Sequence, residues 1–368
     1  LRGYIVKSTQ LIAQEITQHT GTKGEKYITN DRQGFFKMFR TACGGGAIVG
    51  VACVIKLLLS KLDVSLFGQA FLYSTNYALA FAAIYLFHLT LATKQPAMTA
   101  ATLAATIKRD IDQKNKFINI TNISIRTFRS QFIAFLGNVL ISFPVAILLV
   151  ASLSWYIGDN LAYKKANILL YELDPLRSPA VFHAAIAGFF LFLSGLIAGQ
   201  AANRSRYNRM PIRIQKHPLL TRFLSKYRRQ KIAAYYERNI GGISSNLWFG
   251  LFMGTTGTIG VILGLPLDIR HIAFAAGNFG LSLFGHGFSL DLSALLWSIS
   301  GIGLIGFLNF IVSFGLSLAL ALQSRGVALS QLGNILVGLA QAFVKDPFSF
   351  IWPPGRTEEE DLNDIPGS

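Results

Sequence analysis

The stretch LLWSISGIGLIGFLNFIVSFGLSLALAL occupies residues 295–322 and contains no charged side chain. A helix needs about 20 apolar residues to cross the hydrocarbon core of a bilayer, which is roughly 30 Å thick. Buried helices of soluble proteins seldom run this far without a charge, so the stretch predicts a membrane-spanning helix. Five earlier stretches have a similar character, and they lie at residues 42–59, 67–91, 132–156, 181–201 and 247–265. We therefore predict an all-α, polytopic integral membrane protein with about six transmembrane helices.

The composition agrees with a membrane protein but adds a second feature. Of the 368 residues, 52% are apolar and 14% are charged, whereas a soluble domain has about a quarter charged residues. This apolar content excludes intrinsic disorder, and two cysteines are too few for a disulfide scaffold. The chain nevertheless has a formal net charge of +16. The question is therefore where the basic residues lie relative to the apolar stretches.

The basic residues are concentrated in alternate connections between the predicted spans. Seven lie before the first span, seven between the second and third, eleven in the loop at 202–246, and three after the last span. The other connections together hold five. Cytoplasmic loops of membrane proteins carry an excess of Lys and Arg. This asymmetry predicts a multi-pass protein with both ends in the cytoplasm.

The basic loop at 202–246 has two further interpretations beyond topology. Basic residues near an anionic leaflet contribute about 1 kcal/mol each to membrane binding, so the loop is a candidate for contact with anionic phospholipids. Nucleic acid is the less favoured partner, because the inner loop of any membrane protein would look similar. The candidate lipid contacts are Arg204, Arg206, Arg209, Arg213, Arg228 and Arg229.

Three segments are expected along the chain. Residues 1–41 read as a cytoplasmic amphipathic segment, and the start at Leu1 rather than Met suggests the end of a missing N-terminal part. Residues 42–323 form the six-span domain. Residues 324–368 are expected to hold a cytoplasmic interfacial helix and an acidic disordered tail.

A glycine-rich region follows the start of the fifth span. The pairs Gly250/Gly254 and Gly260/Gly264 match the GxxxG pattern that lets helix backbones come close. Pro266 is expected to end or kink the helix. The apolar piece at 272–284 is too short to span a bilayer, so it predicts a re-entrant or interfacial half-helix.

This region also contains the most distinctive polar residues of the sequence. One interpretation is an outer loop with a surface salt bridge. The other is a buried polar centre, because charges at bilayer depth are costly and usually functional. The candidate cluster consists of Asp268, Arg270, His271 and Asn278.

No catalytic, cofactor-binding or metal-ligating pattern is found. The six histidines form no pair at i,i+4, neither cysteine has a CxxC neighbour, and the P-loop and GxSxG patterns are absent. The chain is therefore not expected to be an enzyme or to need a cofactor. Four polar residues inside the predicted spans are expected to bond across helices or, alternatively, to line a polar path. These are Asn76, Asn138, Asn309 and Ser313.

Several short strings resemble one protein family. They are LRGYIVKS at 1–8, EITQHTG at 15–21, ACGGG at 42–46, AGNFG at 276–280 and, most distinctively, GLPLDIRH at 264–271. They are similar to a proteobacterial family of large inner-membrane proteins described as site-specific recombinases. The similarity covers most of the chain, as the C-terminal membrane half of a longer protein. The resemblance implies no established catalytic or binding residue.

The residues themselves do not supply recombinase chemistry. A tyrosine recombinase needs a His-x-x-Arg element, and no histidine here has an arginine at the third following position. A serine recombinase needs a soluble catalytic domain. We therefore expect a non-enzymatic membrane protein, such as a transport, lipid-handling or envelope component. The alternative is a membrane-anchored recombinase whose DNA chemistry lies outside these residues.

Overall fold

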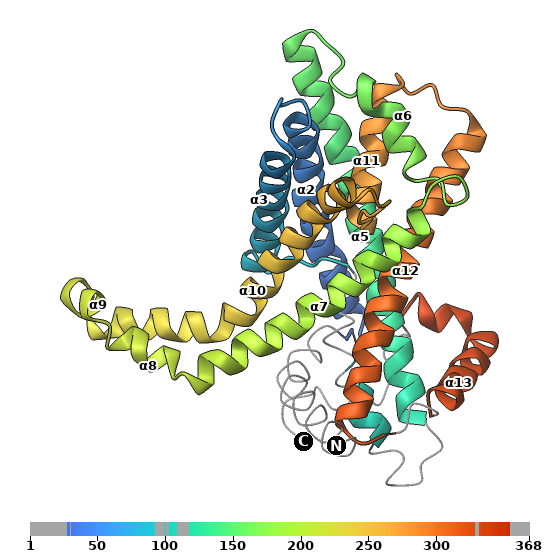
Figure 1. Ribbon diagram of the computed structural model, residues 1–368. Coiled ribbons are helices and arrows are strands. Elements are labelled where there is room, and N and C mark those ends of the chain that lie inside the picture. Colours follow the sequence, from blue (N-terminus) through green and yellow to red (C-terminus); the bar gives the residue numbers. More distant parts are fainter. Residues whose placement is uncertain are drawn as a thin grey trace.

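The computed structural model describes residues 28–29, 31–92, 100, 103–108, 118–327 and 331–353, and this part of the chain folds into helices without any strand (Figure 1). The long helices are α2 (Arg32–Leu59), α3 (Leu66–Leu86), α5 (Ile118–Ile157), α7 (Ala180–Tyr207), α10 (Lys226–Leu263) and α12 (Leu292–Ser324). The shorter elements are α6 (Tyr163–Tyr171), α8 (Met210–Gln215), α9 (Pro218–Phe223), α11 (Ile272–Gly285), α13 (Gln331–Lys345) and the 3₁₀ turn η2 (Pro347–Phe350).

Five of the long helices are long and apolar enough to cross a membrane, namely α2, α5, α7, α10 and α12. The chain is thus a polytopic membrane protein, as predicted. The predicted span at 67–91 corresponds to α3, which is not among these five helices and includes the polar residues Gln69, Thr75 and Asn76. Its 21 residues nevertheless give a length of about 31 Å.

Helix α3 ends five residues before the predicted boundary. His88 adopts a left-handed conformation with φ of 56°, and the amide of Leu89 donates to the carbonyl of Ile84. This is the Schellman arrangement, usually made by glycine, which caps the last carbonyls of a helix. The following backbone then turns back to α2, where the amide of Thr90 donates to the carbonyl of Thr41.

Several other helices extend beyond their apolar stretches. Helix α2 begins at Arg32 rather than at residue 42, because Asp31 accepts a hydrogen bond from the amide of Gly34 at 2.8 Å and caps the helix. The predicted basic loop at 202–246 is largely helical as well. Helix α7 continues to Tyr207, and α10 already begins at Lys226. We call residues 201–240 the basic arm.

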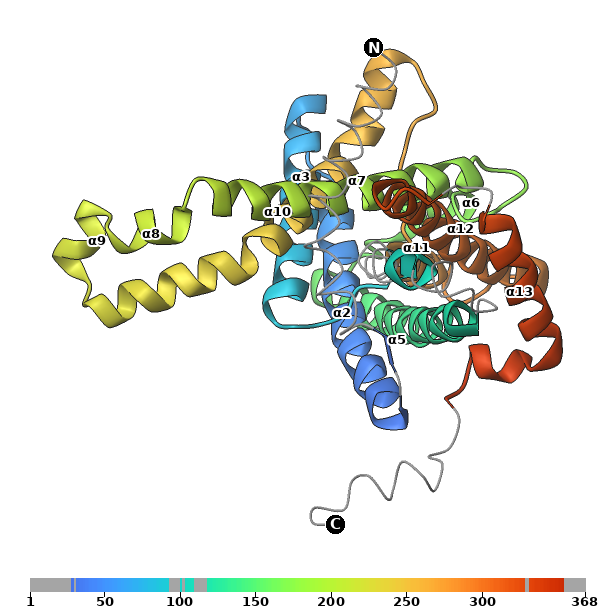
Figure 2. The same cartoon turned by 90° about the horizontal axis from the view of Figure 1, so that it is seen from below.

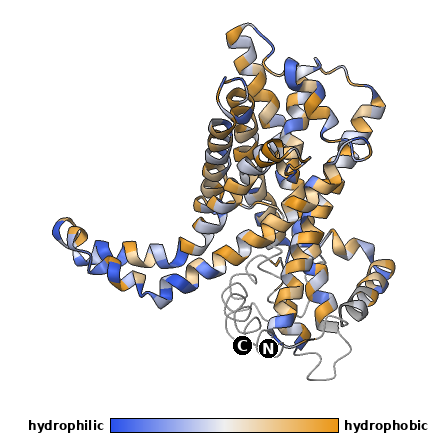
Figure 3. Ribbon diagram, in the orientation of Figure 1, coloured by the Kyte–Doolittle hydropathy of each residue, from blue (hydrophilic) through white to orange (hydrophobic). Residues whose placement is uncertain are grey.

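The helices run alternately up and down through one bundle. Helices α2 and α5 begin, and α12 ends, at the lower end in Figure 1, whereas α6 lies at the upper end. Helix α2 packs against α5 and α3, and α10 packs against α3 and α7. The bundle is coloured mostly as hydrophobic and the projecting basic arm as largely hydrophilic (Figure 3).

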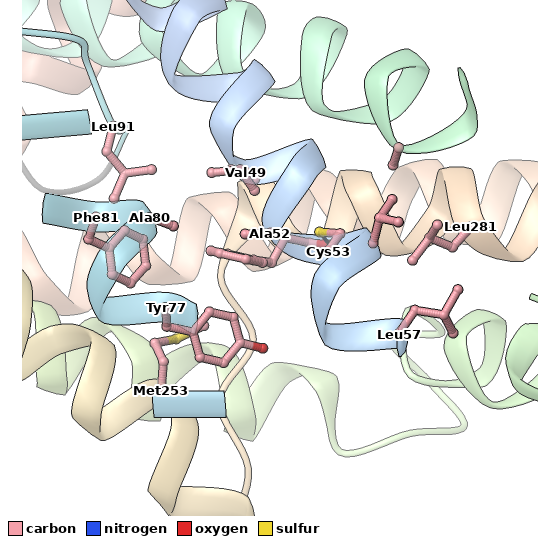
Figure 4. Packing of buried hydrophobic residues seen from close by; sticks show 14 of the residues in the cluster. Val49, Ala52, Cys53, Leu57, Tyr77, Ala80, Phe81, Leu91, Met253 and Leu281 are labelled. Atoms are coloured by element: carbon pink, nitrogen blue, oxygen red, sulfur yellow. Dashed lines mark hydrogen bonds between the residues drawn. The ribbon is translucent and has the colours of Figure 1, made fainter. Parts of the chain in front are cut away.

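The main core lies where α2, α3, α10 and α11 meet (Figure 4). Phe81 of α3 is fully buried, and its ring centroid lies 4.9 Å from that of Phe249. Tyr77 meets Phe274 of α11 edge to face at 4.8 Å. Such edge-to-face pairs stabilise a core beyond the area that they bury.

Glycines allow α10 to touch the backbone of α3. A β-carbon on Gly250 would collide with the backbone of Ala78, and one on Gly254 would collide with the backbone of Ser74. The second predicted GxxxG pair, Gly260 and Gly264, does not bring two helices into contact. A β-carbon on Gly260 would collide with the carbonyls of Leu265 and Leu267, whereas one on Gly264 would enter open space.

The segments that flank the bundle are joined by Arg129 of α5. Its guanidinium donates to the carbonyl of Thr29 at 3.1 Å and to that of Ser349 at 3.5 Å. Trp352 packs edge to face on Phe35 with a centroid distance of 5.4 Å. Helix α13 lies in the region predicted to hold an interfacial helix. Residues 32–41 of the predicted amphipathic segment belong to α2, and most of the rest of that segment and the acidic tail lie outside the described residues.

We predict that Gly254→Ala destabilises the protein, because the added β-carbon would collide with Ser74. Overpacking of this kind costs about 1–3 kcal/mol, and the higher helix propensity of alanine offsets up to about 1 kcal/mol of that loss. Thermal unfolding in detergent micelles measures the change. Gly303→Ala is the matched control, since a β-carbon there would meet no atom of a neighbouring helix within 4 Å. An equal loss of stability in the control contradicts the prediction.

Candidate functional site

The candidate site is built on an interruption between α10 and α11. Gly264 has φ of 64°, and the amide of Leu265 donates to the carbonyl of Gly260, so a Schellman arrangement closes α10. Pro266 has no amide hydrogen with which to continue a helix. The chain stays non-helical to His271, and α11 begins at Ile272. The predicted effect of Pro266 is confirmed.

Helix α11 lies inside the bundle rather than in an outer loop. Twelve of its 14 residues are buried, and it packs against α2, α5, α6 and α12. Its length is about 21 Å, too short to span a bilayer alone. Glycines make this position possible, since a β-carbon on Gly277 would collide with Cys53 and one on Gly280 would lie 2.6 Å from the carbonyl oxygen of Phe143. The predicted short half-helix is therefore the central element of the bundle.

The polar backbone of the interruption is satisfied by side chains of neighbouring helices. Asn309, near the middle of α12 and fully buried, donates to the carbonyls of Arg270 and Ala184, each at 2.9 Å. Its amide oxygen accepts a hydrogen bond from the amide of Ile272 at 3.1 Å. The ring of His183 in α7 hydrogen-bonds the carbonyl of Pro266 at 2.9 Å. Non-helical backbone at membrane depth requires such partners, because no lipid atom can supply them.

Two of the other predicted polar residues also bond across helices. Asn138 of α5 donates to the carbonyls of Ala42 and Thr90, at 2.7 and 3.0 Å. Asn76 of α3 donates to the carbonyl of Ala52 at 2.9 Å. Ser313 differs, because its hydroxyl donates only within α12. The predicted cross-helix role is confirmed for the three asparagines and is wrong for Ser313.

Arg270 is the centre of the charged part of the site. Only 8% of the residue is exposed. Its guanidinium pairs with the carboxylate of Asp268 and, at 3.0 Å, with that of Glu172 in the connection after α6. Asp268 also accepts a hydrogen bond from the amide of Ile269 at 2.8 Å. The two carboxylates keep partial contact with the surroundings, with side chains 32% and 25% exposed.

Arg270 carries one positive charge and its two carboxylate partners carry two negative charges. Lys56 of α2 supplies a second positive charge. It interacts electrostatically with Asp268 and Glu172. Its ammonium lies 5.5 Å from the ring centroid of Tyr73 and 5.8 Å from that of Tyr77, within the range of cation–π attraction. Lys56, Glu172, Asp268 and Arg270 together form a neutral group, which we call the charge network.

The predicted polar cluster is only partly assembled by the fold. Asp268 and Arg270 belong to the charge network. His271 has a different role, because its ring accepts a hydrogen bond from the amide of Ala273 at 3.4 Å and caps α11. The ring of Phe249 lies 5.9 Å from the His271 ring. Asn278 lies seven residues further along α11, about 10 Å from the helix start.

Sequence reasoning missed Glu172. It stands 98 positions before Arg270 in a connection predicted to be an outer loop, and no local pattern marks it as a partner. The only signal in the sequence is its negative charge. Lys56 and Arg270 need acidic partners, and Glu172 is an acidic residue of a predicted outer connection.

The candidate lipid contacts all lie on the basic arm. Five of the six arginines are exposed. Arg229 is half-buried, and its guanidinium donates to the carbonyl of Gln215 at 2.6 Å, so it ties α10 to the end of α8.

The described residues contain no group of three or more His, Cys, Asp or Glu side chains that could hold a metal ion. A shallow, mainly apolar groove of about 280 Å³ lies between α3 and α10. It is separate from the charge network and is lined by Phe71, Ser74, Thr75, Ala78, Leu247, Trp248 and Leu251.

The family model described as "Site-specific recombinase" matches residues 1–353, which is nearly the whole chain. Comparison with curated proteins gives no match.

We predict that Asn309→Leu destabilises the interruption, because it leaves three backbone groups without their partner. Each buried unpaired group costs about 1–3 kcal/mol, so a loss of about 3 kcal/mol or more is expected. Thermal unfolding and hydrogen exchange at the Ile272 amide measure the effect. Ser313→Ala is the control on the same helix, since its hydroxyl bonds only within α12. Unchanged exchange at Ile272 in the Asn309 variant contradicts this assignment.

Proposed function

We infer the function of this chain from two facts: the chain belongs to the site-specific recombinase family, and it is a polytopic membrane protein. We propose that it acts in a bacterial inner membrane without an enzymatic step, as a transport or lipid-handling component of the cell envelope. The charge network is the polar centre of this activity. The family description gives a name for the group and no chemistry for these residues.

The observation that carries the proposal is the position of Arg270. It is nearly fully buried, pairs with two carboxylates, and lies on a break between two helices. Its carbonyl is bonded by Asn309 near the middle of α12, a helix long and apolar enough to cross a membrane. Charges at such depth are rare and mark substrate or ion pathways.

Stability alone gives a weak reason for this arrangement. Replacing a buried ion pair with apolar side chains of similar volume is often neutral or stabilising. Interrupted helices whose half-helix lies in the bundle centre are a common way for transporters to build ion and substrate sites. The partial exposure of Asp268 and Glu172 gives a charged solute or a lipid headgroup access to the network.

The family description favours a second function, a membrane-anchored site-specific recombinase with its DNA chemistry outside these residues. Arg270 and His271, the adjacent pair that most resembles part of a recombinase site, are 8% and 1% exposed. A DNA phosphate cannot reach side chains at this depth. Sequence-specific strand exchange by the purified protein would support this second function over the first.

We predict that neutralising the whole charge network abolishes activity while preserving the fold. The variant combines Lys56→Met, Glu172→Gln, Asp268→Asn and Arg270→Met, and the new asparagine keeps an acceptor for the amide of Ile269. By contrast, Arg270→Ala alone is expected to cost about 3–5 kcal/mol, because it leaves buried charges unpaired.

The activity is measured in vesicles of phosphatidylethanolamine and phosphatidylglycerol. Ion- and pH-sensitive dyes report flux, and a fluorescent-headgroup phospholipid reports lipid transfer. Arg177→Ala is the control, because Arg177 forms a surface pair with Asp174 and is 82% exposed. Loss of activity in the neutral variant with unchanged thermal unfolding is the expected result. Equal activity in the neutral variant and the wild type, or no activity in the wild type, overturns the proposal.

The proposed orientation places the basic arm and the lower end of the bundle in the cytoplasm. It is supported by the sequence asymmetry, since cytoplasmic loops carry the excess of Lys and Arg. The start of α2, the start of α5 and the end of α12 share that end of the bundle (Figure 1).

We predict that Leu176→Cys reacts with a membrane-impermeant maleimide in intact spheroplasts, whereas Tyr207→Cys reacts only after permeabilisation. Both positions are well exposed. The parent chain gives the background, because Cys43 and Cys53 lie within α2. The reverse labelling pattern contradicts the proposed orientation.

A further inference from the structure

The basic arm is a surface that the charge network does not use. It consists of the end of α7, the short helices α8 and α9, and the start of α10. In both Figure 1 and Figure 2 it projects sideways from the bundle. Helices α8 and α9 contain no buried residue. The arm is therefore available to a partner along most of its length.

The arm carries most of the net charge of the protein. It has eleven basic residues and one acidic residue, Glu237, so its net charge is +10 of the total +16. Arg204, Arg206, Arg209, Arg213 and Arg228 are all exposed. Like charges at this density repel one another, so the arm is stabilised by any anionic surface that it can approach.

Large aromatic side chains are exposed between these basic residues. Tyr207 is 89% exposed, and Phe223 and Tyr227 are 74% and 64% exposed. The ammonium of Lys231 lies 4.6 Å from the ring centroid of Tyr227, and the guanidinium of Arg222 lies 5.8 Å from that of Phe223. Basic residues combined with exposed aromatic side chains are typical of helices that lie in a membrane interface.

The arm is also held in a defined shape. Ser225 caps α10 by accepting a hydrogen bond from the amide of Arg228 at 3.4 Å. Arg229 joins α10 to the carbonyl of Gln215 at the end of α8. The charged and aromatic side chains are thus presented on a packed hairpin, which loses little further freedom when it binds a surface.

The direction of the arm favours a membrane surface as its partner. It projects from the side of the bundle, across the direction of α2 and α3 (Figure 1). With these helices across the bilayer, the arm runs along the membrane plane at the basic end of the bundle. We propose that the basic arm is an interfacial anchor that binds the headgroups of anionic phospholipids, with Tyr207, Phe223 and Tyr227 in the headgroup layer.

The test uses the full chain in nanodiscs of phosphatidylcholine, with or without phosphatidylglycerol. A fluorophore on Gln230→Cys, an exposed position of the arm, reports contact with water through quenching by acrylamide. The chain without this cysteine gives the background. Quenching is expected to fall several-fold when phosphatidylglycerol is present and to recover at high salt, because salt screens exposed charges.

A second variant changes the arm and leaves the charge network intact. It replaces Arg204, Arg206, Arg209, Arg213 and Arg228 with glutamine. Each basic residue near an anionic leaflet contributes about fivefold to binding, so the variant is expected to show equal quenching in both lipids. Lys164→Gln, at the opposite end of the bundle, is the control and should behave as the wild type does. Circular dichroism checks that every variant keeps its helix content.

Three outcomes overturn the proposal. The first is equal quenching of the wild type in both lipids. The second is an unchanged lipid effect in the arginine variant. The third is protection of the fluorophore in phosphatidylcholine discs by duplex DNA and not by phosphatidylglycerol, which would assign the arm to nucleic acid. None of these results depends on flux or lipid transfer, so failure of this proposal is distinguishable from failure of the proposed function.

Discussion

The buried amide of Asn309 makes the interrupted helix possible. Inside a bilayer, a backbone group that leaves its helix has no water to bond with, and each unpaired group costs several kcal/mol. Asn309 bonds both sides of the start of α11, and His183 bonds the carbonyl of Pro266. Asn138 does the same for the backbone that follows α3. The central position of α11, and with it the charge network, depends on these few side-chain amides and rings.

The charges of the protein fall into two groups with different physical consequences. The charge network has no net charge, is centred on the buried Arg270 and includes the ion pair between Arg270 and Glu172, which lie far apart in the sequence. The basic arm is exposed and strongly positive, with one acidic residue to oppose it. The first group suits recognition of a solute or headgroup in a low-dielectric setting, where charge interactions are strong. The second suits attraction to an extended anionic surface, which needs many charges and little precision.

The family name implies chemistry on DNA, whereas the described structure places the polar residues of the candidate site inside a helix bundle. Recombination needs nucleophile and phosphate-binding groups that reach DNA, and the described part of this chain places its Arg270–His271 pair inside a helix bundle. The aromatic rings of Phe81, Phe249 and Phe274 surround the His271 ring. In the membrane activity that we propose, the residues at the interruption act where they lie, with no rearrangement of the bundle.

The sequence by itself determined the features that arise from local composition. Runs of apolar residues predicted the spanning helices, Pro266 predicted the end of α10, and the short run after it predicted α11. The tertiary structure decided which residues meet. Glu172 and Arg270 are 98 positions apart. The end of α3 depends on the left-handed conformation of His88, and the start of α10 lies in the packed hairpin of the basic arm. Hydrophobicity is a property of each segment, whereas a salt bridge or a cap is a property of two groups brought together by packing.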